Sequence, residues 1–358
     1  MDPTATAALG RTGIRVTRLG LGTAPIGNLY RAVGEEDALA TVARALDLGV
    51  RLLDTAPLYG YGLAERRLGA ALARSRAGTG SPAGVGSPAG VGSRAGVGSR
   101  AGVVLCTKVG RLLREGAAEA SGGEAGGRGA YVDTPPVTPV FDFSRDGVMR
   151  SMEESLGRLG VDRVDVVHLH DPDDHYHAAL DQAFPALAEL RDQGVIGAVG
   201  VGMNQAGMLA RFAREADFDC FLVAGRYSLL DQSAAGELLP ACARRGIGIL
   251  VGGVYNSGIL ADPGRPGATY DYGPASEAVV ARARRMEAVC DRHGVPLRAA
   301  AIQFPLGHPA VTSVVVGARS AGEMEENYEM ASRPLPEDLW AELQHEGLLP
   351  GWIPVPAS

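Results

Sequence analysis

The chain has 358 residues, of which 46% are hydrophobic, and it carries a formal net charge of −7. This length and composition suffice to fill a sizeable core in one large domain, and the negative charge argues against nucleic acid or an anionic membrane as a partner. No apolar run approaches the roughly 20 residues of a membrane span, and the start Met1–Thr4 lacks the basic residues and apolar stretch of a signal peptide.

Short apolar runs alternate with amphipathic segments along the chain, which is the pattern of consecutive βαβ units in a parallel sheet. After a short hairpin at Leu9–Val16, we expect strands near 18–23, 50–54, 103–108, 164–170, 196–202, 219–224, 247–252 and 312–316. Helices are expected between them at Glu36–Leu48, Leu63–Ala73, Arg145–Leu159, Ala178–Gln193, Gln205–Ala216, Ala234–Arg245 and Glu277–His293. Two more follow the last strand, Ala321–Ala331 and Pro336–His345, and the second is expected to lie outside the barrel. The fold class is therefore α/β, and eight strands of this kind are typical of a (β/α)8 or TIM barrel.

Two insertions interrupt this alternation within what we expect to be a single barrel domain over residues 1–358. Residues 81–102 repeat a six-residue unit, as in Ser81–Gly86, and are too rich in glycine to order themselves. We expect a flexible linker there, on the barrel face opposite the chemistry. Residues 114–140 are expected to form an irregular loop on the catalytic face, because they follow the third strand, and this loop is either a lid or disordered.

Polar side chains stand at the carboxyl ends of three consecutive predicted strands. Asp54 ends the second strand, with Tyr59 five residues later in the following turn, Lys108 ends the third and His170 ends the fourth. A parallel α/β barrel keeps its chemistry at this end of its strands. Taken singly, such residues are ordinary turn formers or solvated surface, but a phenol, an ammonium, a carboxylate and an imidazole together can move a proton to or from an oxygen.

Each of these four residues is assigned a catalytic role. Tyr59 is the acid/base, and Lys108 is expected to lower the pKa of its phenol by favouring the phenolate. Asp54 holds Lys108 charged and oriented, and His170 positions the substrate oxygen or shares its proton. The neighbouring His168 is expected to point to the opposite face of its strand and to be structural.

In this order and context, the four residues resemble the active-site set of the aldo-keto reductase family. The resemblance covers nearly the whole chain, through the segments Leu19–Thr23, Leu53–Gly60, Arg150–Leu159 and Val316–Ser320. It implies a (β/α)8 TIM barrel with an N-terminal β-hairpin that plugs the bottom and an additional C-terminal helix. Within the family, Val201–Asn204 and Arg226–Gln232 are most similar to the branch of D-threo-aldose 1-dehydrogenases (L-fucose dehydrogenases) and pyridoxal 4-dehydrogenases.

The resemblance implies a nicotinamide cofactor, although no GxGxxG motif follows a strand to open a Rossmann unit. Backbone N–H groups where the last strand passes into a helix can hold the pyrophosphate. By resemblance, Asn204 binds the carboxamide and Asn327 the adenine, while Tyr255 either stacks on the nicotinamide or is an ordinary aromatic. The chain departs from the family pattern at Met203, where a serine is usual, and at Ala224-Gly225, where a glutamine is common. The expected cofactor-binding residues are Gly22, Thr23, Asn204, Tyr255, Gly317, Arg319, Glu323 and Asn327.

Glu323 bears on the choice between NAD and NADP. A carboxylate at this position would repel the 2′-phosphate of NADP and accept a hydrogen bond from the free ribose hydroxyl of NAD. Arg319 is a counterweight, since its guanidinium could reach the same phosphate. We therefore expect NAD as the cofactor, with NADP less favoured.

The expected function is that of an NAD-dependent dehydrogenase that oxidises an aldose at C1 to the lactone, with a small sugar or aldehyde as its binding partner. One alternative is an NADPH-dependent aldehyde or ketone reductase or a pyridoxal dehydrogenase, and a remote alternative is a non-catalytic barrel acting as a regulatory subunit. Residues 171–174 either hydrogen-bond a polyol or form an ordinary loop. The four cysteines have no metal-binding spacing, which indicates reduced thiols in a cytoplasmic protein and no metal site.

Overall fold

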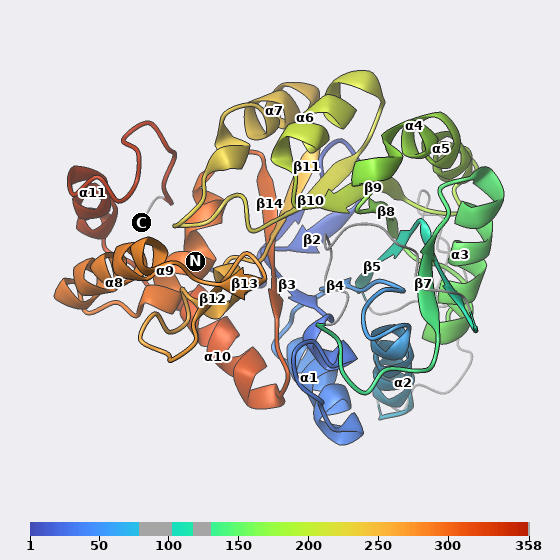
Figure 1. Cartoon of the computed structure of the whole chain (residues 1–358), viewed down its shortest axis with the longest axis horizontal. Coiled ribbons are helices and arrows are strands. Elements are labelled where there is room, and N and C mark those ends of the chain that lie inside the picture. The colour runs from blue at the N-terminus through green and yellow to red at the C-terminus, as the bar shows by residue number, and fades with distance from the viewer. Residues whose placement is uncertain (79–101, 117–129, 357–358) are drawn as a thin grey trace, which may run out of the picture.

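The computed structural model describes residues 1–78, 102–116 and 130–356. The linker expected at 81–102 lies outside the described residues except for Gly102, and so does the middle of the loop expected at 114–140. The described residues form a barrel, its covering helices and several short hairpins (Figure 1).

Eight parallel strands close into a barrel at the centre of the molecule. They follow one another around the barrel in chain order, and the last strand pairs with the first to close it. The strands are β3 (Leu19–Gly22), β4 (Leu52–Asp54), β5 (Val104–Val109), β8 (Val166–His170), β9 (Ala198–Met203), β10 (Cys220–Ala224), β11 (Gly248–Gly252) and β14 (Val311–Gly317). The predicted (β/α)8 barrel is confirmed, and each strand begins and ends within two residues of its expected position.

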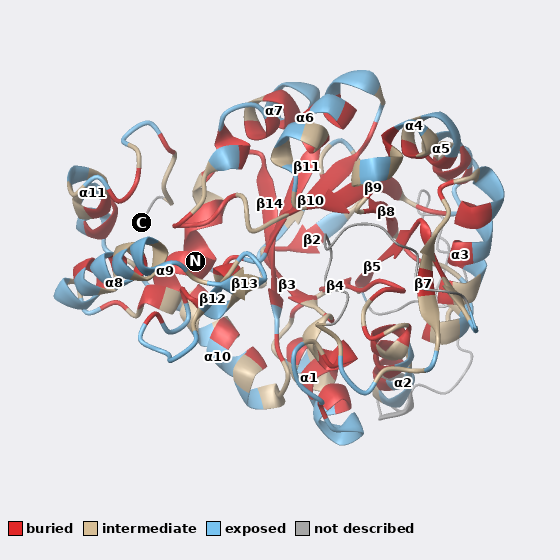
Figure 2. Cartoon of the chain, in the orientation of Figure 1, coloured by how far each residue is buried: buried red, intermediate tan, exposed pale blue. Residues whose placement is uncertain are grey.

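Side chains of the barrel strands alternate between the barrel interior and the surrounding helices, because successive residues of a strand point to opposite faces. On β5, Val104 and Cys106 belong to the interior cluster, whereas Leu105 and Val109 pack with the helices. Figure 2 shows the strands buried along their length and the helices buried on their inner sides. The same alternation directs Lys108 into the interior at the carboxyl end of β5.

The N-terminal hairpin closes the bottom of the barrel, as expected. Its strands β1 (Thr6–Ala8) and β2 (Arg15–Thr17) pair antiparallel, and Leu9 and Val16 join the interior cluster. Gly10 in the turn has a φ of 57°, and a Cβ there would lie 2.6 Å from the backbone oxygen of Asp219. Only glycine therefore lets the turn approach the amino end of β10 so closely.

Helices cover the outer face of the barrel close to the expected places. They are α1 (Glu35–Asp47), α2 (Leu63–Gly78), α3 (Arg145–Leu159), α5 (Phe184–Asp192), α6 (Ala206–Glu215), α7 (Leu238–Arg245), α8 (Glu277–Arg292), α10 (Ala321–Ser332) and α11 (Glu337–His345). Single 3₁₀ turns are η1 (Pro25–Gly27), η2 (Asp173–His175), η4 (Ser233–Ala235), η5 (Asn256–Gly258) and η6 (Phe304–Gly307). As expected, α11 follows the barrel as an additional helix, and Figure 1 shows it beside α8 and away from the strands.

Two helices differ most from the expectation; in addition, α2 continues past its expected end at Ala73, and α7 begins at Leu238 and not at Ala234. The helix expected at Ala178–Gln193 consists of α4 (Tyr176–Ala178), a π-helical turn (Ala179–Ala183) and α5, because Pro185 has no N–H to continue the hydrogen-bond ladder. The other, α9 (Leu297–Gln303), is not among the expected helices. It is buried on nearly all sides, so its sequence shows no amphipathic period.

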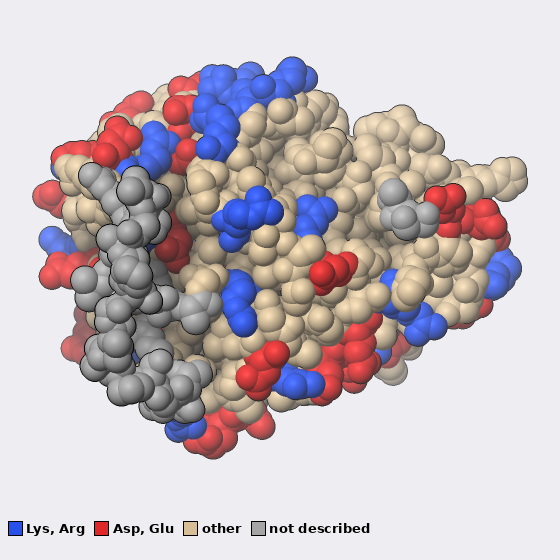
Figure 3. Space-filling view, turned by 180° about the vertical axis from the view of Figure 1, so that it is seen from behind, with Lys and Arg blue, Asp and Glu red and all other residues tan. Residues whose placement is uncertain are grey.

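None of the described helices is long and apolar enough to cross a bilayer. Figure 3 shows one face of the molecule, on which acidic and basic side chains are interspersed around a broad uncharged area.

Candidate active site

Lys108 contacts two of the other three predicted catalytic residues. Its Nζ donates to Asp54 Oδ2 at 2.7 Å, to Tyr59 Oη at 2.9 Å and to the backbone oxygen of Thr55 at 2.9 Å. Lys108 is 1% exposed and Asp54 is 2% exposed, so water does not screen the pair. Because an ammonium has three protons, all of its donor capacity is used within the protein.

His170 completes the group from the next strand, β8. Its ring centroid lies 5.8 Å from that of Tyr59, with the two rings at 88° to each other. The side chain is almost fully buried, and its Nδ1 has no hydrogen-bond partner. The structure thus brings Asp54, Tyr59, Lys108 and His170 together at the carboxyl end of the barrel, where a substrate oxygen can meet both the phenol and the imidazole.

The turn that carries Tyr59 packs backbone to backbone on η1. Gly60 has a φ of 60°, and a Cβ there would collide with the backbone of Gly27. A Cβ on Gly27 would in turn lie 2.9 Å from the carbonyl carbon of Tyr59. Two glycines therefore allow this close approach, which fixes the position of the phenol above the barrel.

The pKa of Tyr59 differs from the sequence-based prediction. Burial raises this pKa well above the ordinary value of a phenol, and the carboxylates of Asp54 and Asp171 raise it further. The sequence-based prediction that Lys108 favours the phenolate does not decide the net shift of this pKa, because removal from water and the two carboxylates outweigh the ammonium at 2.9 Å. At neutral pH the phenol is protonated, so it can accept from Lys108 and donate its own proton to a substrate oxygen.

The imidazole of His170 is neutral at pH 7. Burial lowers its pKa well below the ordinary value, and the cations Arg111 and Lys108 lower it further. A neutral ring can hold a substrate oxygen by a single hydrogen bond, which favours the positioning role over the sharing of a proton. Burial also raises the pKa of Asp54, and the ammonium of Lys108 opposes that rise.

His168 points into the barrel, so the expectation that it faces away from the side of His170 is wrong. Residues two apart on a strand share a face, and His168 lies opposite Lys108 in the register of β5 and β8. Its ring is fully buried, with Nε2 at 3.6 Å from the Sγ of Cys220. Burial lowers the pKa of His168 to about 3. It is therefore a neutral packing residue in the layer beneath the catalytic group.

Tyr59, Lys108 and His170 line one pocket with a volume of about 120 Å³. Further polar residues of the pocket come from loops, among them Tyr131, Asp171 and Tyr272. The ring of Tyr131 stacks on that of Tyr59 with centroids 6.3 Å apart. The two loop tyrosines are not among the predicted site residues, because they lie outside the strand–helix alternation on which the prediction depends.

The loop expected over residues 114–140 begins and ends as a hairpin. Strand β6 (Arg111–Arg114) pairs antiparallel with β7 (Thr138–Phe141), so Arg114 and residues 138–140 of the expected range are in strands, whereas residues 130–137 are irregular apart from an isolated bridge between Tyr131 and Leu29. Only Gly110, with a φ of 99°, separates β6 from β5. The apolar run therefore continues from one strand into the next, and the sequence gives no separate signal for β6. Residues 117–129 lie outside the described part of the chain.

Four of the predicted cofactor residues meet where β3 and β14 end. Gly22 pairs with Gly317 across the two strands, and a Cβ on Gly317 would lie 2.5 Å from the ring of Pro25. The Oγ1 of Thr23 and the Nε of Arg319 are buried without a hydrogen-bond partner. Buried polar atoms without partners usually await a ligand or water. These residues therefore fit the polar part of a nicotinamide cofactor.

Glu323 lies in the first turn of α10, whose N-cap is Ser320. Its Oε2 accepts from the backbone N–H of Arg319 at 2.8 Å, and its own N–H donates to the Oγ of Ser320 at 3.1 Å. Its Oε1 lies 3.2 Å from the guanidinium of Arg31. This carboxylate thus lies at the N-terminal end of the helix and pairs with cations that would otherwise attract a phosphate.

The remaining predicted cofactor residues divide between two places. Asn204 lines the pocket, and its Nδ2 donates to the backbone oxygen of Ala224 at 3.0 Å and to Tyr272 Oη at 3.4 Å. Tyr255 is not among the lining residues, and its hydroxyl donates to Asn327 Oδ1 at 3.0 Å. The Nδ2 of Asn327 donates to the oxygen of Gly317 at 3.2 Å. In this structure Tyr255 and Asn327 tie the end of β11 to α10.

Residues 18–345 match the Aldo/keto reductase family. The chain is 41% identical to D-threo-aldose 1-dehydrogenase of a Pseudomonas species, over 98% of both proteins. It is 40% identical to pyridoxal 4-dehydrogenase of Microbacterium luteolum, over 96% of this chain and 97% of the other. Among solved structures, a putative aldo-keto reductase of Pseudomonas aeruginosa is 26% identical with a TM-score of 0.60, covering 91% of this chain and 93% of its own.

A fourth similarity concerns the fold alone. An aldo-keto reductase of Bacillus halodurans, solved in its holo form, has a TM-score of 0.68 at 24% identity and covers 95% of each chain. The same eight-stranded barrel therefore underlies proteins that differ at most positions. The family match over most of the chain and the two relatives near 40% identity lead to one conclusion: the chain belongs to the aldo-keto reductase family of nicotinamide-dependent oxidoreductases.

Proposed function

We propose that the protein is an NAD-dependent dehydrogenase that oxidises an aldose of the L-fucose or D-threo type at C1 to the lactone. The observation that carries this proposal is the contact of 2.9 Å between Tyr59 Oη and Lys108 Nζ at the wall of a small, partly polar pocket. The likeness to D-threo-aldose 1-dehydrogenase supports the sugar as substrate. The likeness to pyridoxal 4-dehydrogenase supports pyridoxal as a second candidate.

In the proposed oxidation, Tyr59 Oη receives the proton of the C1 hydroxyl while a hydride leaves C1. The nicotinamide, when bound, supplies the hydride acceptor. His170 holds the reacting oxygen by a hydrogen bond, and Lys108 stabilises the phenolate that accepts the proton. Because burial raises the pKa of Tyr59, phenolate is scarce at neutral pH. Sugar oxidation should therefore accelerate as the pH rises, whereas aldehyde reduction, which uses the protonated phenol, should not.

The substrate is tested by following nicotinamide absorbance with a panel of aldoses, pyridoxal and simple aldehydes, in both directions and with both cofactors. We expect the highest kcat/KM for an aldose in the oxidative direction with NAD. A higher kcat/KM for pyridoxal would replace the sugar with the second candidate. Faster aldehyde reduction with NADPH would establish the reductase alternative, and no turnover on any substrate would leave a non-catalytic barrel.

The cofactor proposal predicts that NAD is used better than NADP, and that Glu323→Arg moves the ratio of their kcat/KM values towards NADP. The change removes a carboxylate next to Arg319 and Arg31 and adds a group that pairs with a 2′-phosphate. The ratio should move by more than about tenfold, which corresponds to about 1.4 kcal/mol. The measurement is kcat/KM for both cofactors at one saturating sugar concentration.

Glu323→Gln is the matched control for this change. Its amide oxygen can still accept from the Arg319 N–H, so it keeps this hydrogen bond but loses the charge. We expect its ratio to lie between those of the wild type and Glu323→Arg. A wild type that prefers NADP, or a Glu323→Arg ratio that stays where it was, would show that this carboxylate does not face the ribose.

A further inference from the structure

Arg111 and Asp171 form a buried ion pair at the wall of the catalytic pocket. The Nη2 of Arg111 donates to Asp171 Oδ2 at 2.7 Å, and the two side chains are 3% and 13% exposed. Asp171 lines the pocket, and its Oδ2 lies 3.6 Å from the Nε2 of His170. A carboxylate therefore stands beside the imidazole that positions the reacting oxygen.

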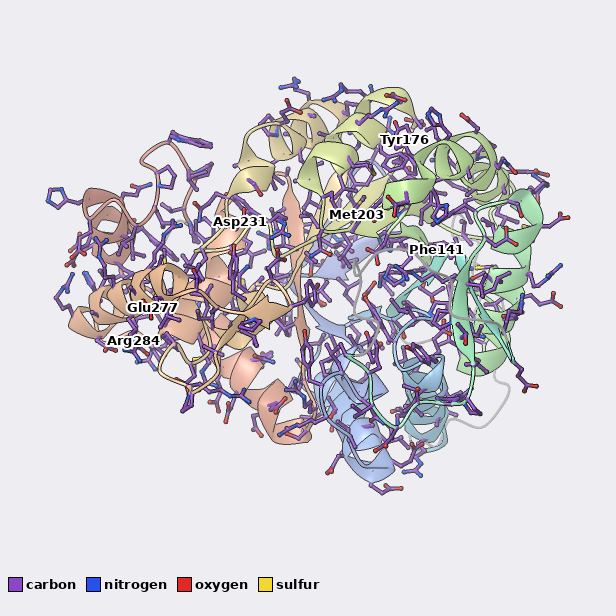
Figure 4. All side chains as sticks on the ribbon, viewed as in Figure 1. Phe141, Tyr176, Met203, Asp231, Glu277 and Arg284 are labelled. Atoms are coloured by element: carbon purple, nitrogen blue, oxygen red, sulfur yellow. The ribbon has the colours of Figure 1, made fainter. Side chains whose placement is uncertain are left out.

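Both members of the pair are held in place by neighbouring strands. Arg111 begins β6, and its guanidinium carbon lies 4.3 Å from the ring centroid of Phe141 on β7, which Figure 4 labels. Asp171 has a φ of 44°, and its N–H donates to the backbone oxygen of Gly202 on β9 at 3.0 Å. The carboxylate is thus aimed by two different strands and does not depend on a ligand for its orientation.

Stability does not account for such a pair. Removing two charges from water offsets most of their attraction, and a well-packed apolar pair of similar volume often stabilises a fold equally well. A carboxylate has about four acceptor positions, and the contact with Arg111 Nη2 uses one of them. The carboxylate of Asp171 can therefore accept further hydrogen bonds at the pocket wall.

We propose that the Arg111–Asp171 pair selects hydroxylated substrates. Asp171 accepts a hydrogen bond from a hydroxyl on the carbon next to the reacting carbon, and Arg111 keeps the carboxylate ionised and aimed. The proposal rests on the proposed dehydrogenase function and deepens it, because it names 2-hydroxy aldoses and α-hydroxy aldehydes as the substrate class. A substrate oxygen held by His170 brings the neighbouring hydroxyl within reach of Asp171. A substrate without that hydroxyl leaves an acceptor position of the buried carboxylate unfilled, which a site of this kind discriminates against.

The test compares substrates that differ only in this hydroxyl. One pair is an aldose and its 2-deoxy analogue in oxidation, and the other is 2-hydroxypropanal and propanal in reduction. The wild type should prefer the hydroxylated member by at least about tenfold in kcat/KM, because a polar site rejects an analogue that lacks the matching group. Asp171→Asn should reduce this preference in kcat/KM to about threefold or less, mainly through a change in KM, because the neutral amide is a weaker acceptor.

Two further variants keep the test decisive. The double variant Arg111→Met with Asp171→Leu removes both charges, so no unpaired charge is buried, and it should also lose the preference. Glu154→Gln is the matched control. Glu154 Oε1 accepts at 2.8 Å from Arg114, which lies on β6 as Arg111 does, but Glu154 does not line the pocket. It should keep the wild-type ratio.

The outcomes separate this inference from the proposed function. A wild type without preference in the aldehyde pair overturns the inference, and so does a folded Asp171→Asn or double variant that keeps the wild-type ratio. If the wild type reduces 2-hydroxypropanal but oxidises no sugar, the proposed function fails while the aldehyde pair still decides the inference. Circular dichroism checks the fold, and the double variant decides if Asp171→Asn does not fold.

Discussion

Replacing Tyr59 with phenylalanine is expected to lower kcat by about 10²–10⁴-fold, which is the typical effect of losing a general acid/base. The change removes only the oxygen that accepts from Lys108 at 2.9 Å. The ring remains against Tyr131 and His170, so the pocket keeps its shape. Binding of NAD should therefore stay close to that of the wild type. The measurements are kcat for an aldose and the dissociation constant of NAD by titration calorimetry.

Tyr61→Phe is the matched control for this prediction. Tyr61 follows in the same turn and its ring also lies 6.3 Å from that of Tyr131, but it does not line the pocket. Its loss of a hydroxyl should leave turnover unchanged. If Tyr59→Phe turned over within a few-fold of the wild type, Tyr59 would not be the acid/base and the roles assigned to its neighbours would fall with it.

Lys108→Met should also lower kcat strongly, and it should move the pH dependence of sugar oxidation to higher pH. Oxidation needs the phenolate, so its rate is lost as the pH falls through the pKa of Tyr59. Burial already raises that pKa, and removing the ammonium takes away the nearest group that favours phenolate. The pKa therefore rises further, and the midpoint of the profile moves in the alkaline direction. The measurement is kcat against pH for the residual activity.

The Lys108→Met variant also leaves the carboxylate of Asp54 buried without its cation. Such a loss typically costs about 3–5 kcal/mol of stability, so thermal unfolding should be measured beside activity. The double variant Lys108→Met with Asp54→Asn removes the unpaired charge and should recover part of the stability but none of the activity. An unchanged pH profile, with only weaker sugar binding, would contradict the role assigned to Lys108.

The barrel and the centre of its site are predictable because both follow from local patterns. Each buried strand is a short apolar run with its own turn signal, and parallel strands place their carboxyl ends on one side. Asp54 and His170 each end such a run and Lys108 lies one residue before the end of β5, so their meeting follows from the fold class once the strands are assigned. The error at His168 is a failure to apply the two-residue period of a strand, not a limit of the sequence.

Other features depend on tertiary contacts that no local pattern contains. The raised pKa of Tyr59 results from burial beneath Tyr131 and from the charges of Asp54 and Asp171, which come from separate elements. Tyr272 reaches Asn204 from the hairpin of β12 (Thr269–Tyr270) and β13 (Gly273–Pro274). Strands of two residues leave no periodic signal in a sequence. Loops of this kind set the shape of the pocket, and they are the least predictable part of the chain.

The burial of Lys108 has a practical consequence for handling this protein. Lys108 is the only lysine in the sequence, and its ammonium is sealed from solvent by Asp54, Thr55 and Tyr59. Reagents that acylate or alkylate primary amines therefore meet no accessible lysine, although the chain has many arginines. Coupling through amines should thus be confined to the terminal α-amino group and should leave the buried ammonium of Lys108 untouched, so that immobilisation or labelling at one point preserves the pocket.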